Sequence, residues 1–207
     1  MALRPDLAAI AEMIPPGARV LDVGCGDGAL LEHLAATKQV DGRGLELSQQ
    51  NVNACVARGL SVVQGDADAD LGEYPSQVFD VAILSQTIQA TRNPKAVLGD
   101  LLRIGRHVVV SLPNFGHWKV RFALLARGRM PRTTTLCYEW YDTPNIHLCT
   151  IADFVDLARK SGAEIAQAMA LTPDGSTRPM RPQAWIPNFL AEGAIFLLRP
   201  SAQSQKM

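Results

Sequence analysis

The sequence has little cysteine and no excess of charge of either sign. Its 207 residues include four cysteines, Cys25, Cys55, Cys137 and Cys149, and no two of these form a C-x-x-C pair. This spacing argues against a zinc or redox site, so we expect free thiols and no metal. Lys plus Arg and Asp plus Glu each number 20. Without a positive field the chain lacks the usual driving force for nucleic-acid binding, and we expect no nucleic-acid partner.

Long hydrophobic runs are also missing. No apolar stretch approaches the roughly 18 residues of a membrane span, and the N-terminus lacks a charged-then-apolar signal pattern. We therefore expect no membrane partner and a cytoplasmic location. The length fits one α/β domain, which would bury roughly 70% of the surface that the unfolded chain exposes. We expect this domain to span residues 1–200, followed by a disordered polar tail at 201–207.

Three closely spaced glycines mark the first functional motif, within the run Val20-Leu-Asp-Val-Gly-Cys-Gly-Asp-Gly28. An apolar, β-prone stretch leads into the glycines, and residues 29–36 read as a helix. Because glycine has no Cβ and accepts positive φ, such a turn lets a ligand approach the amides at a helix start. A turn whose glycines serve only geometry is the alternative, and the pattern further along the chain must decide.

Two nucleotide cofactors compete for this turn. The nicotinamide fingerprint G-x-G-x-x-G/A is met if Ala29 stands for the third glycine. However, Asp22 and Asp27 would repel a pyrophosphate at this distance. S-adenosylmethionine carries a sulfonium and an amino group and no phosphate, so the same two acids would attract it.

Strands and helices alternate along the first half of the chain. We expect strands near residues 20–23, 42–47, 61–64, 78–84 and 106–112, and helices near 3–14, 29–36, 49–58 and from 94 onward. This alternation predicts a doubly wound α/β fold with a mostly parallel sheet and right-handed crossovers. After a helix near 151–159, two β-like runs at 165–171 and 194–198 are predicted to pair as an antiparallel edge.

Polar residues follow each of the first four predicted strands, at Asp22, Glu46, Asp66 and Ser85. Carboxyl ends of parallel strands share one edge of the sheet, where ligands of doubly wound folds bind. Glu46 could accept hydrogen bonds from both hydroxyls of a ribose, and Asp66 could accept one from an adenine amine. Any one of these acids alone is more commonly a surface strand end. Their joint register is what favours a binding site.

With these motifs, the sequence resembles the class I S-adenosylmethionine-dependent methyltransferases. Their first motif matches Leu21-Asp-Val-Gly-Cys-Gly-Asp-Gly28, and the match extends over Glu46, Gly65-Asp-Ala67 and the strand 79–85. The resemblance implies a Rossmann-like, seven-stranded sheet with an antiparallel edge hairpin and an insert after the fifth strand. It also implies S-adenosylmethionine or S-adenosylhomocysteine as the small-molecule ligand.

The family pattern assigns roles to individual residues. It implies that Glu46 holds the ribose, that Asp66 and the Ala67 amide hold the adenine, and that Asp22 and the Gly24 region face the methionine part. A backbone carbonyl near Ser85 would help to hold the amine of the cofactor. The cofactor-binding residues predicted in this way are Asp22, Gly24, Gly26, Glu46, Leu47, Gly65, Asp66, Ala67 and Ser85.

Within that fold, the chain more closely resembles the MetW family of methionine biosynthesis proteins. The matching segments are Leu84-Ser-Gln-Thr-Ile-Gln-Ala90, Val109-Val-Ser-Leu-Pro-Asn-Phe-Gly-His-Trp118, Gly128-Arg-Met-Pro131 and Tyr141-Asp-Thr-Pro-Asn-Ile-His147. This resemblance implies a role beside a homoserine O-acyltransferase rather than a settled methyl-transfer reaction.

The insert at residues 114–149 is rich in aromatic residues and arginine. A segment of this length in a compact domain is typical of a lid or a docking surface. Residues 115–127 place Trp118, Phe122 and Leu125 at helical spacing, with basic residues around them. Such a stripe suits a protein-binding patch, and equally a lid helix that packs on the domain's own core.

The insert also holds the candidates for a catalytic base, His117, His147 and Tyr138. Methyl transfer needs a base only if the nucleophile must lose a proton. For each histidine a structural, hydrogen-bonded role is the alternative. Two functions thus stay open. One is a cofactor-binding accessory subunit of homoserine acylation, and the other is a small-molecule methyltransferase with its acceptor under the insert. A nicotinamide dehydrogenase is a distant third.

Overall fold

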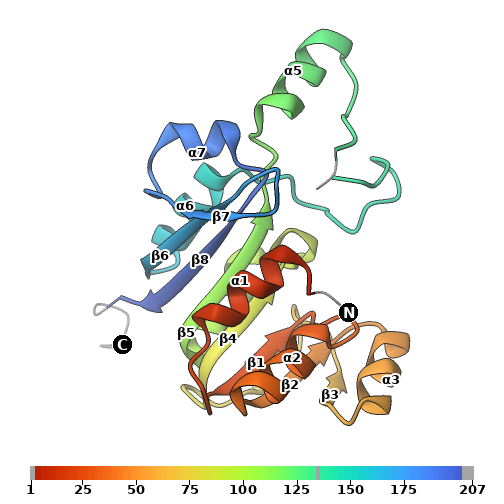
Figure 1. Ribbon diagram of the computed structural model, residues 1–207, viewed down its shortest axis with the longest axis vertical. Coiled ribbons are helices and arrows are strands. Elements are labelled where there is room, and N and C mark those ends of the chain that lie inside the picture. Colours follow the sequence, from red (N-terminus) through yellow and green to blue (C-terminus); the bar gives the residue numbers. More distant parts are fainter. Residues whose placement is uncertain (1–2, 134–135, 202–207) are drawn as a thin grey trace.

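One mixed sheet forms the centre of the protein, and the computed structural model describes residues 3–133 and 136–201. Within these residues the sheet has eight strands in the order β3-β2-β1-β4-β5-β8-β6-β7 (Figure 1). The strands are β1 (Arg19–Val23), β2 (Asp41–Glu46), β3 (Ser61–Gln64), β4 (Phe79–Ser85), β5 (Gly105–Pro113), β6 (Ala163–Leu171), β7 (Thr177–Pro179) and β8 (Gly193–Pro200).

Seven α-helices and two short 3-10 turns connect the strands in the described part of the chain. They are α1 (Pro5–Met13), α2 (Ala29–Lys38), α3 (Gln49–Ala57), η1 (Leu71–Glu73), η2 (Ile88–Ala90), α4 (Pro94–Ile104), α5 (Trp118–Arg127), α6 (Ile151–Lys160) and α7 (Trp185–Leu190). The predicted helices are all present, with ends that differ by a few residues.

Strands β1 to β5 run parallel to one another, as the alternation of strands and helices predicts. Strand β8 is antiparallel to both of its neighbours, β5 and β6. The predicted antiparallel pairing of 165–171 with 194–198 is therefore confirmed, but β8 lies inside the sheet and β7 forms the edge. The predicted count of seven strands is one too low, because β7 is only three residues long and ends in Pro179, which gives no alternating pattern.

Side-chain caps fix the start of two of the connecting helices. The Ser48 side chain accepts a hydrogen bond from the Asn51 amide at the start of α3. Asn93 does the same for the Ala96 amide at the start of α4, where Pro94 occupies the first helical position. Each cap satisfies an amide that has no partner inside the helix, so both helices begin where the sequence predicts.

The core lies on both faces of the sheet. Residues of α1 and α2 pack with Val20, Ile83 and Val109 on one face. Residues of α4 and α6 pack with Leu84 and Phe196 on the other. Burial on both sides explains the apolar runs Val81–Leu84 of β4 and Val108–Val110 of β5. It also leaves the carboxyl edge of the parallel strands as the place for polar groups.

The insert leaves this layered body after β5. Helix α5 projects from the sheet, and the chain after it returns along a loop beside the body (Figure 1). The helix predicted at 115–127 is confirmed from Trp118 onward. No helix in the described ranges is long and apolar enough to cross a membrane. Of the tail predicted to be disordered, only residue 201 lies among the described residues.

Candidate functional site

The glycine-rich turn between β1 and α2 holds three residues at positive φ. These are Gly24 at +71°, Gly26 at +57° and Gly28 at +80°. A Cβ on Gly24 would lie 2.6 Å from Oγ1 of Thr87, and neighbours crowd Gly28 in the same way. A Cβ on Gly26 would meet no atom within 4 Å. Packing therefore explains two of the glycines, while Gly26 faces open space where a ligand can approach the backbone.

The carboxylate of Glu46 joins the end of β2 to this turn. Its Oε2 accepts a hydrogen bond from the Gly26 amide at 2.9 Å, and its Oε1 accepts one from the Ser48 amide at 2.9 Å. The residue is 8% exposed. An ionised carboxylate offers about four lone-pair sites, so the fixed group can still accept bonds from a ligand. Glu46 is thus held rigidly at the rim of the sheet.

A cavity of about 250 Å³ opens beside Glu46 at the carboxyl edge of the sheet. It is lined by Val23, Gly24, Leu45, Glu46, Leu47, Gly65, Asp66, Ala67, Asp68, Thr87, Ala90 and Thr91. Six of the nine predicted cofactor residues are in this lining, and the other three, Asp22, Gly26 and Ser85, are not. The side of the cavity formed by Thr87, Ala90 and Thr91 was missed by the sequence analysis, although the segment 84–90 stood out as a family motif.

Asp66 forms part of the cavity wall, but its carboxylate already has partners. Its Oδ2 lies 2.5 Å from Nη2 of Arg92, and its Oδ1 accepts a hydrogen bond from the Asp68 amide at 2.9 Å. Asp68 in turn accepts hydrogen bonds from the amides of Arg92 and Asn93. These contacts tie the loop after β3 to the start of α4. An amine bound at Asp66 would share the carboxylate with Arg92.

Asp22 lies buried at the strand end, with 2% of its surface exposed. Its Oδ1 has no hydrogen-bond partner among the described residues. The pKa of Asp22 is raised to about 7, mainly by burial and also by the negative Glu46, while the positive Arg4 acts in the opposite direction. An unpaired carboxyl oxygen in a buried place is a costly group unless a donor reaches it. The site therefore suits a ligand that brings a positive, hydrogen-bonding group.

A polar cluster from α1 and its preceding residue adjoins this position, which the sequence analysis did not foresee. Arg4 donates to both oxygens of Asp6 at 2.8 and 2.9 Å, and Asp6 is 2% exposed. Gln86 donates to Asp6 at 3.1 Å, and Arg4 reaches the hydroxyl of Ser85 at 3.3 Å. The carbonyl of Ser85 accepts a hydrogen bond from the Thr87 hydroxyl at 2.8 Å. The start of α1 is therefore fastened to the end of β4.

None of the three candidate bases lines the cavity that holds the predicted cofactor residues. His117 is buried as the N-cap of α5, and its Nδ1 accepts a hydrogen bond from the Lys119 amide at 3.3 Å. Burial lowers the pKa of His117, in spite of the nearby negative charge of Glu192. The exposed His147 has its Nε2 3.4 Å from the Arg92 carbonyl. Tyr138 is half exposed in the insert.

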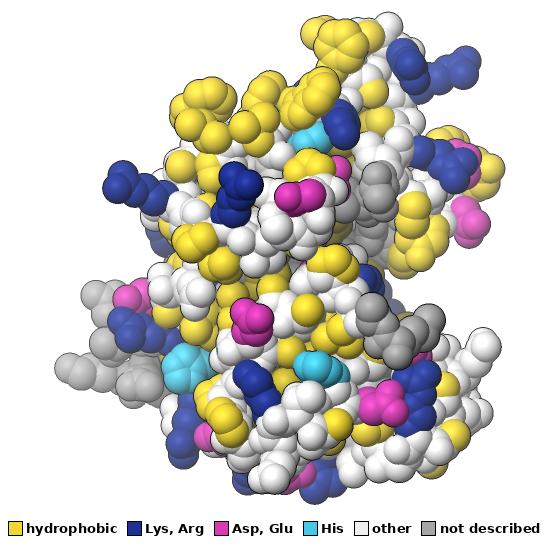
Figure 2. Space-filling model, in the orientation of Figure 1, with side chains coloured by type: hydrophobic (Ala, Val, Ile, Leu, Met, Phe, Trp, Pro, Cys, Tyr) yellow, Lys and Arg dark blue, Asp and Glu magenta, His cyan; other side chains and the backbone are white. Residues whose placement is uncertain are grey.

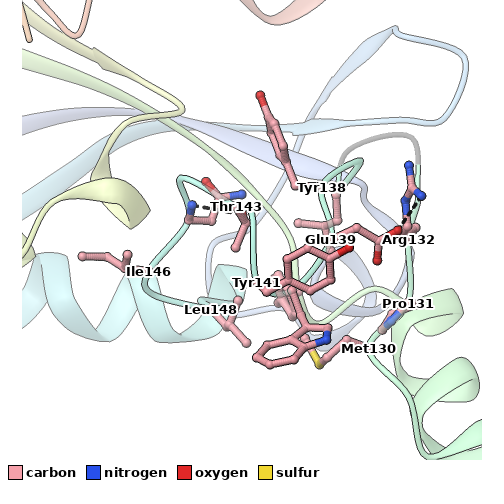
Figure 3. Close-up of a pocket in the computed structure, with 13 residues that line it drawn as sticks. Met130, Pro131, Arg132, Tyr138, Glu139, Tyr141, Thr143, Ile146 and Leu148 are labelled. Carbon is pink, nitrogen blue, oxygen red and sulfur yellow. Dashed lines mark hydrogen bonds and ion pairs between the residues drawn. The ribbon is translucent and has the colours of Figure 1, made fainter. Parts of the chain in front are cut away.

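The insert contains a second cavity, of about 420 Å³ (Figure 3). Its lining is mostly aromatic and apolar: Phe115, Met130, Pro131, Arg132, Leu136, Tyr138, Glu139, Trp140, Tyr141, Thr143, Asn145, Ile146 and Leu148. Arg132 and Glu139 form an ion pair of 2.7 Å at one side. The ring of Tyr141 lies on the side of Glu139, whereas Tyr138 points away from both (Figure 3). This cavity could take an apolar group but has few fixed polar contacts.

Comparison with known protein families shows to which family the chain belongs. The model of the family described as methionine biosynthesis protein MetW matches residues 4–198. The chain belongs to the MetW family. The bifunctional methionine biosynthesis protein MetXA/MetW of Rhodopirellula baltica is 36% identical over 166 residues, which are 76% of this chain and 27% of that protein. This MetW chain thus spans about a quarter of the length of that relative.

Solved structures confirm the predicted fold class. An S-adenosylmethionine-dependent methyltransferase from Thermotoga maritima superposes with a TM-score of 0.68 at 16% identity, over 94% of this chain and 87% of that one. Phosphoethanolamine N-methyltransferase 2 of Haemonchus contortus, in complex with S-adenosylmethionine, gives 0.68 at 15% identity, over 95% of this chain and 52% of that one. The MetW chain therefore has the α/β fold of class I methyltransferases, with antiparallel strands at one side of a mostly parallel sheet.

Proposed function

We propose that this MetW chain binds S-adenosylmethionine or S-adenosylhomocysteine and acts as an accessory or regulatory subunit of a homoserine O-acyltransferase. The observation that carries the proposal is the relative whose single chain joins a MetXA part to a MetW part. Fusion of two proteins keeps them at a high effective concentration, as suits partners that work together. S-adenosylmethionine is made from methionine, so a subunit that binds it could report the pathway's later product.

The cavity at the carboxyl edge supports the ligand in this proposal. Glu46, Asp66 and Ala67 all line this cavity. In the proposal, Glu46 accepts the ribose hydroxyls, and Asp66 and the Ala67 amide bind the adenine. The unpaired oxygen of buried Asp22 suits the cationic methionine part. The bound cofactor would supply an electrophilic methyl group. In the accessory role the chain only has to hold this molecule, and no base is needed beside the cavity.

Replacing Glu46 by alanine tests the ligand assignment. We expect the affinity for S-adenosylhomocysteine to fall by about 2 kcal/mol or more, because two charge-assisted hydrogen bonds are lost. Isothermal titration calorimetry measures this, with Glu32→Ala on the exposed side of α2 as the matched control. Unchanged affinity in Glu46→Ala would show that the ribose lies elsewhere. A titration with a nicotinamide dinucleotide, in which we expect no heat, excludes the dehydrogenase.

The insert cavity favours a second candidate, a small-molecule methyltransferase. This cavity of about 420 Å³ has a mostly apolar lining, and it could hold a methyl acceptor. Transfer would then require only that the acceptor atom lie in line with the methyl group, with a base where the acceptor must lose a proton. Release of S-adenosylhomocysteine in a screen of small acceptors would support this candidate. Retained turnover in a triple variant lacking His117, His147 and Tyr138 would rule these residues out as its base.

A further inference from the structure

Two helices of this protein contain almost no fully buried side chain. In the ten-residue α5 the only buried side chain is Val120, and the six-residue α7 has none. Helices this short are marginal in water and are normally stabilised by packing an apolar face. Their apolar faces are exposed instead: Trp118 41%, Phe122 64% and Leu125 86% on α5, and Trp185 73%, Ile186 51% and Leu190 51% on α7.

These six residues form the α5–α7 face. Contacts beneath this face join the two helices. The guanidinium of Arg121 on α5 stacks 5.6 Å from the ring of Phe189 on α7. Buried Asn114, just before α5, donates to the carbonyls of Asn188 and Ala191 at 3.0 and 2.8 Å. Figure 2 shows hydrophobic side chains gathered over α7 and along α5 on the same side of the molecule. The two helices thus present one surface.

The size of the α5–α7 face matches one side of a protein interface. With about 200 Å² for a whole large apolar side chain, the exposed fractions of the six residues correspond to on the order of 700 Å². Monomers rarely show a contiguous apolar patch above a few hundred Å². A standard interface takes about 800 Å² from each partner, and its energy concentrates in residues such as tryptophan. Two tryptophans lie in this face.

The charge around the α5–α7 face indicates what kind of partner covers it. Residues 114–131 contain no Asp or Glu but contain Lys119, Arg121, Arg127 and Arg129. Among the described residues, Glu192 is the one acid that lines a groove with Lys119, Arg127 and Arg129. In a two-fold dimer the same patch meets itself, so these cations would outnumber their counter-charges. A different protein, with an apolar patch bordered by carboxylates, would neutralise them. The charge therefore argues against a second copy of this chain.

We propose that the α5–α7 face is the docking surface for the homoserine O-acyltransferase. This inference rests on the proposed function, because the occupant is chosen from the MetXA part joined to MetW in the Rhodopirellula baltica relative. The acyltransferase covers the apolar side chains of α5 and α7, and its acidic residues meet Lys119 and Arg127. None of the six residues of the face lines the cavity that contains Glu46 and Asp66, so docking there is compatible with an open cofactor cavity.

Two single substitutions at exposed positions test the surface, Leu125→Asp on α5 and Trp185→Asp on α7. Val56→Asp is the matched control, since Val56 is 56% exposed on α3, far along the chain from either helix. The dissociation constant of the complex with the acyltransferase of the same source is measured by calorimetry. Affinity for S-adenosylhomocysteine is measured in parallel to verify folding. We expect at least a tenfold weaker complex for both variants, a change within twofold for Val56→Asp, and unaltered cofactor affinity.

The outcomes separate this surface from the function on which it rests. If the native chain binds the acyltransferase and both variants bind equally well, the surface is wrong and the accessory role stands. If the native chain itself forms no complex, the proposed function fails and the surface assignment fails with it. Light scattering of the chain alone tests whether a second copy of the chain covers the face instead. A dimer that Leu125→Asp dissociates would assign the face to a second copy and overturn the inference.

Discussion

Asp22 is the residue whose charge we expect to change near neutral pH. Its pKa is raised from 3.8 to about 7, mainly by burial. The folded protein therefore binds more protons than the unfolded chain between about pH 4 and pH 7, so stability falls as the pH rises through this window and levels off above it. A rise in pKa from 3.8 to about 7 corresponds to a loss of about 4 kcal/mol of stability across the window.

Urea unfolding of the native chain and of Asp22→Asn, at pH 5 and pH 8 without ligand, measures this effect. We expect the native chain to lose stability from pH 5 to pH 8 and the variant to lose much less, because asparagine does not ionise. A ligand ammonium favours the ionised carboxylate, so binding at pH 6 should also release a proton, detectable as a buffer-dependent heat. Parallel losses in the two proteins would show that Asp22 does not titrate in this range.

A glycine can be required in a turn by its positive φ or by the close approach of a ligand, and Gly26 allows the two to be told apart. Alanine at this position meets no neighbour and adds only the strain of a positive φ, roughly 1–2 kcal/mol of stability. Gly17, at φ +67° and also without neighbours, is the matched control. We expect Gly26→Ala and Gly17→Ala to lose similar stability, but only Gly26→Ala to lose cofactor affinity, by tenfold or more in a titration. Equal affinities would mean that no ligand approaches Gly26.

The sequence predicts the place of a site residue when a local pattern marks it, and not when its partner lies far away in the chain. Gly24, Glu46 and Asp66 follow predicted strands, and the rule that strand ends share an edge placed them correctly around one cavity. Asp6 gave no such signal. Its partner Gln86 lies 80 positions away, and a carboxylate in the first turn of a helix looks like an ordinary surface group. Only the folded contact shows that α1 is fastened to the edge of the sheet.

At the scale of elements, Asn114 joins the end of β5 to the helices of the proposed docking face. Its side chain donates to two carbonyls near α7 and accepts from the Gly116 amide at 2.8 Å, and it is 1% exposed. Asn114→Ala would leave these buried groups without partners, at a cost of about 3 kcal/mol. It should also weaken the acyltransferase complex, because α5 and α7 lose their common support.

Urea unfolding measures the loss of stability, and limited proteolysis measures the opening of the chain after β5. The control is Asn53→Ala, at an exposed position of α3. We expect that control to change stability by less than about 0.5 kcal/mol. A stability close to that of the native chain in Asn114→Ala would mean that α5 and α7 are held by other contacts.

The elements themselves were predictable where the signal was local. The apolar run of β4 and the caps Ser48 and Asn93 carry their structure in a few neighbouring residues. Strand β7 and helix α7 do not, since one is three residues long and the other buries no side chain. The insertion of β8 between β5 and β6 depends on contacts between residues far apart in the sequence. The predicted pairing of β6 with β8 suggested an edge hairpin, whereas the complete sheet shows that β8 lies between β5 and β6.

At the scale of the whole molecule, β5 connects the two functional regions. Its Ser111 accepts hydrogen bonds from the amide of Gln86, next to the proposed cofactor edge. Three residues later Asn114 supports the α5–α7 face. A molecule bound at the edge and a protein bound at the face would therefore act on the two ends of one strand segment. This arrangement suits a subunit whose ligand alters the activity of its partner.

The rate of homoserine acylation is the property that an accessory subunit must change. The acyltransferase of the same source is assayed with and without this MetW chain, while the concentration of S-adenosylmethionine is varied. We predict a clear rise in rate when the chain is added, and a further dependence on S-adenosylmethionine that Glu46→Ala removes. An unchanged rate, together with no complex in solution, would contradict the accessory role and favour the methyltransferase.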